Sequence, residues 1–489
     1  MGLISDIDFV VPHIHPCPRR RSYHVDHRDR KTIRESRSTS LRNTPYHQTS
    51  WLESCLAYHH RYGITKPYGS HILHRTPPSP APTSETKNPL ILFDEFINSH
   101  CKYVRNIVAD MISKQSGSGR VAGFVIDMFC TSMIDVANEF NIPSYVFFTS
   151  GAAFLGFKFH IQTLTDDQNQ DIVQLSYSET EIRIPTFAKP VPTKVLPSAV
   201  QSRETLDLVL SMTRRLREVK AIMVNSFLEL ETHAIDSLSS DNTIPPVYPV
   251  GPILNLEGGT GVGVGKSPEN DVIRWLDNQP PSSVVLLCFG SMGSFEAVQV
   301  KEVARALEQS GYRFVWSLRQ APNGTTKVPG DYEDPRTVLP EGFLERTDGI
   351  GKVIGWAPQV ELLAHTAVGG FVSHCGWNSL LESLWLGVPV ATWPMYAEQQ
   401  INAFEMVLEL GLAVEIKLDY KKDLFNPMVK TVIVTANEIE SGIRRVMEDD
   451  SVRRKVKTMS EKSRSTVMEG GSSYASFSSL IQNLIRNVS

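Results

Sequence analysis

The sequence predicts an α/β fold in which two doubly wound domains, each with a parallel sheet, face a common cleft. Three observations support this prediction. The chain has 489 residues, which is more than a single hydrophobic core usually accommodates. Short apolar segments alternate with segments of helical periodicity, a pattern typical of βαβ units. A segment rich in proline and glycine, at 243–270, separates two series of this kind and indicates a domain boundary.

The first series begins at about residue 88, where regular spacings of apolar residues start. The elements expected in it are a helix at 90–112, a strand at 121–129, a helix at 133–142, a strand at 143–150 and a strand that runs into a helix at 221–231. We assign 88–250 to an N-terminal domain and 251–268 to the linker that follows it.

The second series has the same alternation and more elements. They are a strand at 282–291, a helix at 298–311, strands at 313–319 and 352–358, a helix at 360–368, a strand at 369–374, a helix at 379–387, a strand at 389–394 and final helices at 437–450 and 474–488. We assign 269–470 to a C-terminal domain and 471–489 to a separate C-terminal helix.

Composition excludes several classes of protein. With 41% hydrophobic residues, 21% charged residues and a net charge of −4, the chain has an ordinary globular composition. No apolar run approaches the roughly 20 residues of a membrane-spanning helix. The balance of 49 basic to 53 acidic residues argues against nucleic acid as a partner. Six cysteines without a C-x-x-C pair predict a reducing, cytoplasmic location, and we expect a monomer.

Residues 1–87 have a different composition from the rest of the chain. Nine of the 14 histidines lie between His13 and His74. The segment from Arg19 to Arg42 contains nine lysines and arginines but only three acidic residues. Little helix or strand periodicity is present. This composition predicts disorder rather than an organelle-targeting signal. A metal site is not expected, because the histidines lack the helical spacing of metal ligands.

The glycine-rich segment at 258–267 is similar to a phosphate-binding loop but does not satisfy the pattern. Thr260 stands where G-x-x-x-x-G-K-S requires its first glycine, and Lys266 stands where G-x-G-x-x-G requires its last. No strand leads into the segment. A flexible linker is therefore expected here, and a dinucleotide-dependent dehydrogenase is not.

The segment at 356–399 carries the strongest chemical signal. A strand ends at His374, and a turn through Gly376 opens the next helix. The N-terminus of a helix offers unpaired N–H groups and a positive dipole end, which suit a diphosphate. Trp356 follows another strand and could stack on a base, and Glu382 lies one turn into the helix, where a ribose could bind.

Further polar residues follow the next strand, where Glu398 and Gln399 offer partners for sugar hydroxyls. Each residue alone is equally compatible with a structural role, such as a helix cap at Asn378 and Ser379 or a tryptophan in the core. Because they converge at successive strand ends, where open α/β sheets bind ligands, the segment predicts a nucleotide-sugar site.

This 44-residue segment resembles the donor-binding signature of plant family-1 UDP-glycosyltransferases almost position for position. The resemblance extends from about residue 88 to the end of the chain and includes the texts FVIDMFC, FGSMGS and GGSSYASFSSLI. It implies the GT-B fold of two Rossmann-like domains, with UDP-sugar bound by the C-terminal half and the acceptor by the N-terminal half. The texts FVIDMFC and IPSYVFFTS are similar to the branch that glucosylates phenolics and other small hydrophobic metabolites.

The resemblance also implies roles for individual donor-site residues. It assigns uracil to Trp356, Ala357 and Gln359, the diphosphate to Ser291, His374, the Trp377 backbone, Asn378 and Ser379, the ribose to Glu382, the sugar to Glu398 and Gln399, and a contact with sugar or phosphate to Thr149. In this family a final glutamine accompanies glucose, so Gln399 implies UDP-glucose as co-substrate.

The mechanism implied by the resemblance is a single inverting displacement without a metal. A histidine in the first strand-helix loop deprotonates the acceptor hydroxyl, and an aspartate orients that histidine. Asp127, in the text FVIDMFC, matches this aspartate. A structural alternative for Asp127 is a helix cap at the end of a strand.

The family's opening strand and its P-x-P-G-x-G-H turn are absent from this sequence. His13 and His15 lack the glycine turn and the helix after it, so neither is assigned. We hypothesise that the first segment is translated out of frame. If the codons of residues 14–32 are read one base later, with allowed synonymous codons, they can encode FIPAPGAGHIMSTIEIAKL. In the same frame, the codons of residues 69–77 can encode DRISFIELP. We therefore expect the first βαβ unit to be missing or disordered.

Three functions remain open at this point. The first is a UDP-glucose-dependent transferase that acts on a hydroxyl of a small hydrophobic or phenolic acceptor. The second is a catalytically impaired UDP-sugar-binding protein without the catalytic histidine. The third is a UDP-sugar epimerase of similar fold, against which the 44-residue segment argues. The sequence determines neither the acceptor nor whether transfer is to oxygen, nitrogen or sulfur, because acceptor pockets are mostly apolar and built from loops.

The coding DNA of residues 1–87 tests the frame hypothesis. We expect its synonymous codons to spell the two shifted texts, since a strand, a glycine turn, a histidine and a helix in succession are hard to obtain by accident. Sequencing the transcript is the measurement. Codons that spell other residues in that frame would disprove the hypothesis.

Overall fold

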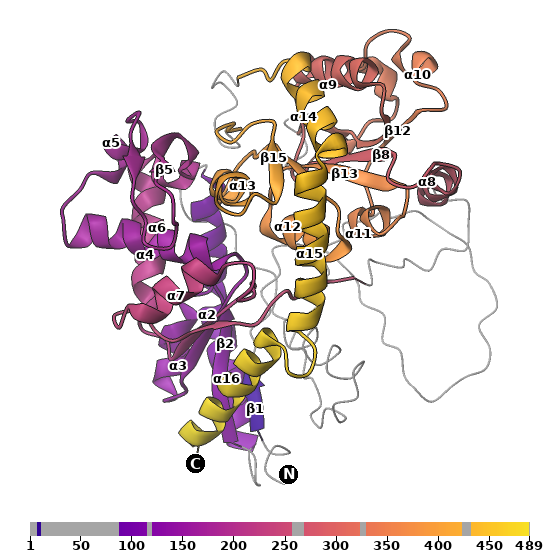
Figure 1. Cartoon of the computed structure of the whole chain (residues 1–489). Helices are drawn as coiled ribbons and strands as arrows, with labels where there is room; N and C mark the ends of the chain where they lie inside the picture. Colours follow the sequence, from indigo (N-terminus) through magenta and orange to yellow (C-terminus); the bar gives the residue numbers. More distant parts are fainter. Residues whose placement is uncertain are drawn as a thin grey trace, which may run out of the picture.

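The computed structural model describes residues 7–10, 88–114, 120–256, 268–322, 329–422 and 432–488. Two α/β bodies, each built on a parallel sheet, make up this part of the chain (Figure 1). The predicted α/β class is thereby confirmed. His13, His15 and both out-of-frame sequences lie outside the described residues, as does the glycine-rich segment at 258–267.

The first sheet has five parallel strands in the order β1-β2-β3-β6-β7. The strands are β1 (Ile7–Val10), β2 (Arg120–Asp127), β3 (Ser144–Phe148), β6 (Ala221–Val224) and β7 (Val247–Pro249). Two of them depart from expectation. β1 lies in the segment that showed little periodicity, and β7 lies in the proline-rich segment interpreted as a linker. β7 is an edge strand. Pro249 lacks a backbone N–H, and at the edge of the sheet this costs no hydrogen bond to a neighbouring strand.

Helices flank this sheet, and α2 and α3 match the two helices expected there. They are α2 (Pro89–Lys114), α3 (Met133–Glu139), α4 (Ala152–Asp166), α5 (Ile172–Ser176), α6 (Arg203–Leu216) and α7 (Thr232–Ser240), with the short hairpin β4 (Glu181–Ile182) and β5 (Val191–Pro192). Phe124, Phe148 and Phe157 are fully buried between sheet and helices, so strand and helix share one apolar core.

The second sheet has six parallel strands in the order β12-β9-β8-β13-β14-β15. They are β8 (Val284–Cys288), β9 (Arg313–Ser317), β12 (Gly351–Ile354), β13 (Val368–Ser373), β14 (Val390–Thr392) and β15 (Ala413–Glu415). Counted along the chain, this is the 3-2-1-4-5-6 order of doubly wound folds. The order reverses between β8 and β13, which is where such sheets bind ligands.

Helices precede, connect and follow the strands of the second body. They are α8 (Pro268–Asp277), α9 (Ala297–Ser310), α10 (Phe343–Arg346), α11 (Gln359–Leu363), α12 (Trp377–Leu386), α13 (Gln399–Phe404), a π-helical turn (Glu405–Glu409), α14 (Ala436–Glu448) and α15 (Asp450–Thr466); the small hairpin β10 (Arg319–Gln320) and β11 (Gly330–Asp331) joins them. α15 was not expected from the sequence, because polar residues dominate it.

The C-terminal helix α16 (Ser472–Val488) returns to the first body and packs on β2 and β7 (Figure 1). Leu480 and Leu484 share a buried cluster with Val125, Tyr145 and Met223 of the first sheet. At the start of the helix, the Ser473 hydroxyl donates to the Gly251 carbonyl at 2.5 Å. α16 therefore covers part of one face of the first sheet.

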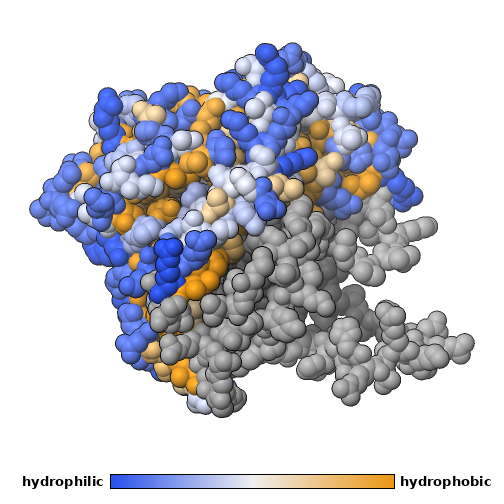
Figure 2. Space-filling model, turned by 60° about the horizontal axis from the view of Figure 1, so that its bottom comes forward, coloured by the Kyte–Doolittle hydropathy of each residue, from blue (hydrophilic) through white to orange (hydrophobic). Residues whose placement is uncertain are grey.

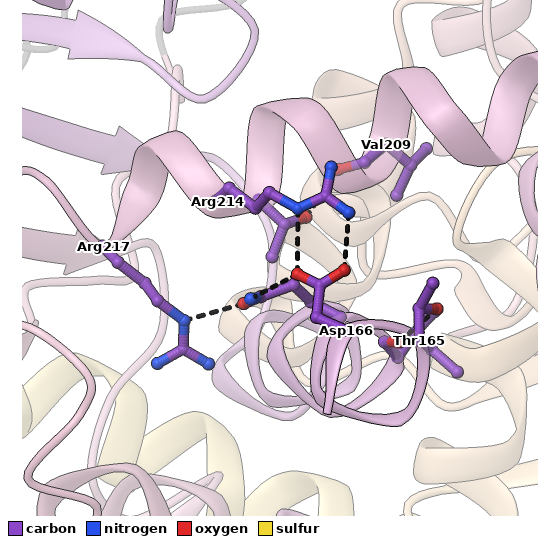
Figure 3. A network of polar contacts seen from close by, with 8 residues as sticks. Thr165, Asp166, Val209, Arg214 and Arg217 are labelled. Atoms are coloured by element: carbon purple, nitrogen blue, oxygen red, sulfur yellow. Dashed lines mark hydrogen bonds and ion pairs between the residues drawn. The ribbon is translucent and has the colours of Figure 1, made fainter. Parts of the chain in front are cut away.

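A polar network joins α4 to α6 (Figure 3). The Asp166 carboxylate accepts hydrogen bonds from Arg214 Nε at 2.9 Å and from Nη2 at 2.6 Å. Gln162 donates to the same carboxylate at 3.0 Å and accepts from Arg217 Nε at 2.7 Å. The hydrogen bonds from Arg214, the largest influence, lower the pKa of Asp166 to about 2. The network fixes the end of α4 that lies away from the second body.

None of the helices in the described ranges combines the length and the apolar composition needed to cross a membrane. Hydrophilic residues cover most of the described surface on the face shown in Figure 2, and apolar residues appear between them.

The Asp166 network makes a pH-dependent contribution to stability. Because the pKa of Asp166 is lowered on folding, its stabilisation is complete above the usual pKa near 4 and is lost as the pH falls towards 2. We expect Asp166→Asn to reduce the free energy of unfolding by about 1 kcal/mol at pH 7. Urea unfolding at pH 7 and pH 3 measures this. Asp167→Asn is the matched control, and an equal loss in both variants would contradict the expectation.

Candidate active site

The carboxyl ends of three neighbouring strands bring the central site residues to one edge of the second sheet. Ser373 of β13 is in register with Cys288 of β8 and with Thr392 of β14. The segments that follow these strands contain Ser291, His374 and Glu398. All three predicted site residues therefore follow strands that end at the edge where the strand order reverses.

His374 lies at this switch point with its imidazole buried. Burial lowers the pKa of the ring to about 4, so His374 is neutral at physiological pH. Its Nδ1 is buried and has no hydrogen-bond partner in the described part of the chain. Its Nε2 lies so close to Gly290 and Gly376 that a Cβ at either position would come within 2.6 Å of it. The site thus holds a buried polar atom that is available to a ligand.

The turn after His374 presents the N-terminus of α12. Cys375 has a φ of +62°, in the left-handed region that residues other than glycine rarely adopt. Two side chains hold it there: Ser373 Oγ accepts from its N–H at 3.2 Å, and Asn402 donates to its carbonyl at 3.0 Å. Gly376 precedes the helix and has no side chain to cap it. The first N–H groups of α12, from Trp377 onwards, remain available for an anion.

A second group of predicted residues follows β12 and reaches α12. The Gln359 side chain donates to Ser379 Oγ at 2.9 Å and to Glu382 Oε2 at 2.7 Å. Burial raises the pKa of Glu382 to about 7. Trp356 exposes 37% of its surface, whereas Trp316 and Trp393 of the same body are fully buried. Ala357, beside it, is buried. An exposed indole next to a carboxylate and an amide suits a flat base and a ribose.

Glu398 and Gln399 follow β14 through a strained turn. Ala397, before them, has a φ of +56°. The Gln399 side-chain oxygen accepts from the N–H groups of Met395 at 2.9 Å and of Tyr396 at 3.0 Å, which fixes this side chain. Burial raises the pKa of the Glu398 carboxyl.

Asp127 ends β2 in the first sheet. Its Oδ1 accepts a hydrogen bond from the Phe129 N–H at 2.9 Å. α3 begins after Ser132, so Asp127 does not cap that helix. Burial raises the pKa of Asp127 to about 6, above the usual value of an aspartate. A buried carboxylate with an elevated pKa at a strand end is typical of functional sites.

The two bodies meet at the start of α12. Trp377 Nε1 donates to the Asn225 carbonyl at 2.7 Å, and the Asn225 side chain donates to Asn378 Oδ1 at 3.5 Å. Half-buried Thr149 follows β3, and a Cβ on nearby Gly151 would lie 2.9 Å from the Trp377 ring. The structure therefore places Asn225 beside the start of α12, and Gly151, two residues after Thr149, lies against the Trp377 ring.

Sequence reasoning missed Asn225 as a site residue. The signal was present, because Asn225 directly follows the apolar strand β6, as Thr149 follows β3. Its amide also accepts from the Ile253 N–H at 2.8 Å, so it positions the chain between the two bodies. Within the described ranges, no group of three or more histidine, cysteine or carboxylate side chains gathers as metal ligands would.

Comparisons with known proteins show the family to which the chain is related. A model of the family "UDP-glucoronosyl and UDP-glucosyl transferase" matches residues 235–464. The chain is 56% identical over 396 residues to UDP-glucose flavonoid 3-O-glucosyltransferase 6 of Fragaria ananassa, covering 80% of this chain and 81% of the relative. It is 56% identical over 372 residues to anthocyanidin 3-O-glucosyltransferase 1 of Manihot esculenta, covering 76% and 79%.

Solved structures show the same architecture. A UGT transferase from Siraitia grosvenorii in complex with UDP has a TM-score of 0.75 and 47% identity, covering 84% of this chain and 86% of that one. UGT71G1 of Medicago truncatula, complexed with UDP-glucose, has a TM-score of 0.71 and 41% identity, covering 82% of each chain.

The contact between the two bodies gives a testable expectation. Trp377→Phe keeps the aromatic packing but leaves the carbonyl of buried Asn225 without its donor. We expect the free energy of unfolding to fall by about 1–3 kcal/mol. Urea unfolding followed by circular dichroism measures this. Trp385→Phe, on the same helix, is the matched control, and equal effects of the two substitutions would refute the assignment.

Proposed function

The chain belongs to the plant family of UDP-glycosyltransferases, and from this membership we propose that it transfers glucose from UDP-glucose to a hydroxyl of a small phenolic acceptor, with inversion. The observation that carries the proposal is that a neutral buried histidine, an uncapped helix N-terminus and the Gln359–Glu382 pair lie around α12, at the carboxyl edge of the second sheet. The names of the relatives, which are glucosyltransferases of flavonoids and anthocyanidins, favour a transferase over an impaired UDP-sugar-binding protein or an epimerase.

We propose that the donor lies along the carboxyl edge of the second sheet. Trp356 stacks on uracil, and Ala357 and Gln359 hold its edge. Glu382 accepts from the ribose hydroxyls, since its carboxylate is already oriented by Gln359. Ser291, His374, Asn378, Ser379 and the Trp377 N–H hold the diphosphate, while Thr149 approaches from the first body. The neutral imidazole donates one N–H without adding a fixed positive charge.

Glu398 and Gln399 bind the glucose in this proposal. The Gln399 oxygen is occupied by two backbone N–H groups, so its amide nitrogen remains to donate to a sugar hydroxyl. Glu398 accepts from neighbouring sugar hydroxyls. These two side chains come from the segment that follows β14, next to the diphosphate turn.

The reaction we propose is one displacement at the anomeric carbon. The acceptor oxygen forms a bond to C1 as the bond from C1 to the diphosphate oxygen breaks, and the electron pair leaves with UDP. The N-terminal dipole of α12 and the donors around it stabilise the charge that develops on UDP, so the transfer proceeds without a metal. Asp127 acts on the acceptor side, where it orients the group that removes the hydroxyl proton.

We further propose a cytoplasmic, monomeric enzyme. The cysteines in the described ranges, Cys101, Cys130, Cys288 and Cys375, are free thiols, as proteins of a reducing compartment have. Size-exclusion chromatography with light scattering tests the monomer.

The role of Glu382 predicts a pH dependence of donor binding. Its pKa of about 7 means that it is largely protonated at pH 6 and ionised at pH 8, and only the carboxylate accepts from both ribose hydroxyls. We expect the affinity for UDP-glucose, whose diphosphate does not titrate in this range, to rise about tenfold between these pH values. Calorimetric titration measures it.

Glu382→Gln should weaken binding and abolish this pH dependence. Exposed Glu361→Gln, on the neighbouring helix α11, is the matched control and should keep it. A pH dependence that persists in Glu382→Gln would contradict the assigned role.

The role of Asp127 predicts a separation of binding from transfer. We expect Asp127→Asn to lower kcat by about 10²–10⁴-fold, the usual range for a proton-transfer group, with unchanged affinity for UDP-glucose. Transfer to a panel of flavonoids and simple phenols is measured by chromatography of the glucosides. Wild-type protein that binds UDP-glucose but transfers none of it would instead favour the UDP-sugar-binding alternative.

A further inference from the structure

Residues 183–195 of the first body make a second contact with the second body. This segment, which we call the strap, follows β4 and includes β5. Two hydrogen bonds fix it to its own body. Thr186 Oγ1 donates to the Ala153 carbonyl of α4 at 3.0 Å, and His233 Nε2 of α7 donates to the Pro185 carbonyl at 3.0 Å. The strap is therefore held on the first body close to the start of α4.

A carboxylate of the second body binds the strap through its backbone. Glu409 Oε2 accepts from the Ala188 N–H at 3.0 Å, and Glu409 Oε1 accepts from the Lys189 N–H at 2.7 Å. The Lys189 ammonium also donates to the Leu408 carbonyl. Two successive N–H groups that point at one anion are a recurrent binding arrangement, and the charge of the acceptor strengthens both hydrogen bonds. Glu409 therefore holds the strap at two adjacent positions of its backbone.

Two aromatic rings pack close to this polar contact. Phe187 of the strap and Phe404, the last residue of α13, meet edge to face with their ring centroids 5.9 Å apart. The exposed fraction is 6% for Phe187 and 1% for Phe404, so both side chains are removed from water. Such a pair combines the burial of two large apolar side chains with a preferred geometry of aromatic rings. The strap and the end of α13 therefore share a dry contact.

The short helix α13 connects the strap to the proposed donor site. Its first residue is Gln399, which binds the sugar in the proposal above. Its fourth residue, Asn402, donates to the Cys375 carbonyl of the donor turn at 3.0 Å, and its last residue, Phe404, meets the strap. The π-helical turn that ends at Glu409 continues α13 without a break, and such turns are frequent at functional sites. One continuous element thus joins the strap to the residues around the sugar and the diphosphate.

We propose that Glu409 is a positioning residue for glucosyl transfer, because by holding the strap it sets the first body and its acceptor against the sugar at Gln399. The proposal rests on the proposed function. A displacement of about 1 Å can lower the rate of such a transfer by about 10²-fold. With the strap released, the acceptor is misplaced and water reaches C1. The water oxygen then forms the bond to C1 and gives its proton to solvent, while the bond from C1 to UDP breaks and its electron pair leaves with UDP.

The ratio of glucoside formed to UDP released tests this role in the full chain, with UDP-glucose and the flavonoid that wild-type protein glucosylates fastest. We expect Glu409→Ala to lower kcat for transfer by about tenfold and to lower the ratio, with unchanged affinity for UDP-glucose. Glu409→Gln, which keeps one acceptor oxygen for two N–H groups, should give an intermediate ratio. A wild-type ratio in Glu409→Ala overturns the proposal whatever the change in kcat, because a protein that is only less stable loses both products in proportion.

Two further variants control for indirect effects. Exposed Glu461→Gln, on α15 of the same body, removes a carboxylate away from the strap and should keep both kcat and the ratio. Phe187→Leu weakens the contact from the side of the strap and should lower the ratio, as Glu409→Ala does. Thermal unfolding shows whether each variant is folded. If Glu409→Ala is not, Glu409→Gln replaces it, and a wild-type ratio in Glu409→Gln then overturns the proposal.

Amide hydrogen exchange of the UDP-bound protein gives a readout that needs no turnover. We expect the peptide that contains Ala188 and Lys189 to exchange about tenfold faster in Glu409→Ala than in wild-type protein, with unchanged exchange in β8 and β13. Equal exchange of that peptide in both proteins overturns the role of Glu409 alone. Wild-type protein that binds UDP-glucose but forms no glucoside contradicts the proposed function, and the positioning role with it, so the two failures are distinguishable.

Discussion

The hydrogen bond from the Trp377 indole to the Asn225 carbonyl is the contact on which the arrangement of the site depends. Trp377 is the first residue of α12, whose N-terminus faces the expected diphosphate, and Asn225 directly follows β6 of the other body. The bond therefore connects the carboxyl edges of the two sheets. Because both sheets are parallel, every functional segment of each body starts at one edge, and one well-placed contact between those edges brings acceptor side and donor side together.

Buried carboxylates lie near this contact. Their raised pKa values indicate that the interface between the two bodies excludes water. Glu231 of the first body accepts from the N–H groups of Ala152 at 2.9 Å and of Ala153 at 2.6 Å, and so caps α4. Glu405 of the second body faces it, and burial together with the charge of Glu231 raises the pKa of Glu405 well above its usual range. The same loss of water raises the pKa values of Asp127, Glu382 and Glu398.

Such an environment strengthens each electrostatic interaction with a substrate. A neutral His374 and an uncapped helix end both face a region of low polarity, where a diphosphate gains more than it would in water. The strained backbone at Cys375 and Ala397 is consistent with this interpretation. Both residues adjoin site side chains, and hydrogen bonds with Ser373 and Asn402 hold Cys375 in place.

The periodicity of the sequence predicted most elements of the two sheets, because buried parallel strands are continuous apolar runs. β8, β13 and β14 lie where the apolar runs indicated. Periodicity failed where burial does not follow from local pattern. The proline in β7 is typical of a linker, yet it is tolerated at a sheet edge, and the polar α15 carries only a narrow apolar face. The separate C-terminal helix was expected, but its packing on the first sheet was not.

The sequence by itself determined the fold class, the donor segment and the residue types that bind a nucleotide sugar, since these depend on local spacing and on a long specific motif. Only the tertiary structure decided which residues of the first body meet that segment. Asn225 and Glu231 stand in unremarkable local contexts, and their significance comes from contacts far along the chain: Asn225 accepts from Trp377, and Glu231 accepts from the first N–H groups of α4. The physical reason is that burial and charge pairing are set by the packing of two sheets, which no local pattern records.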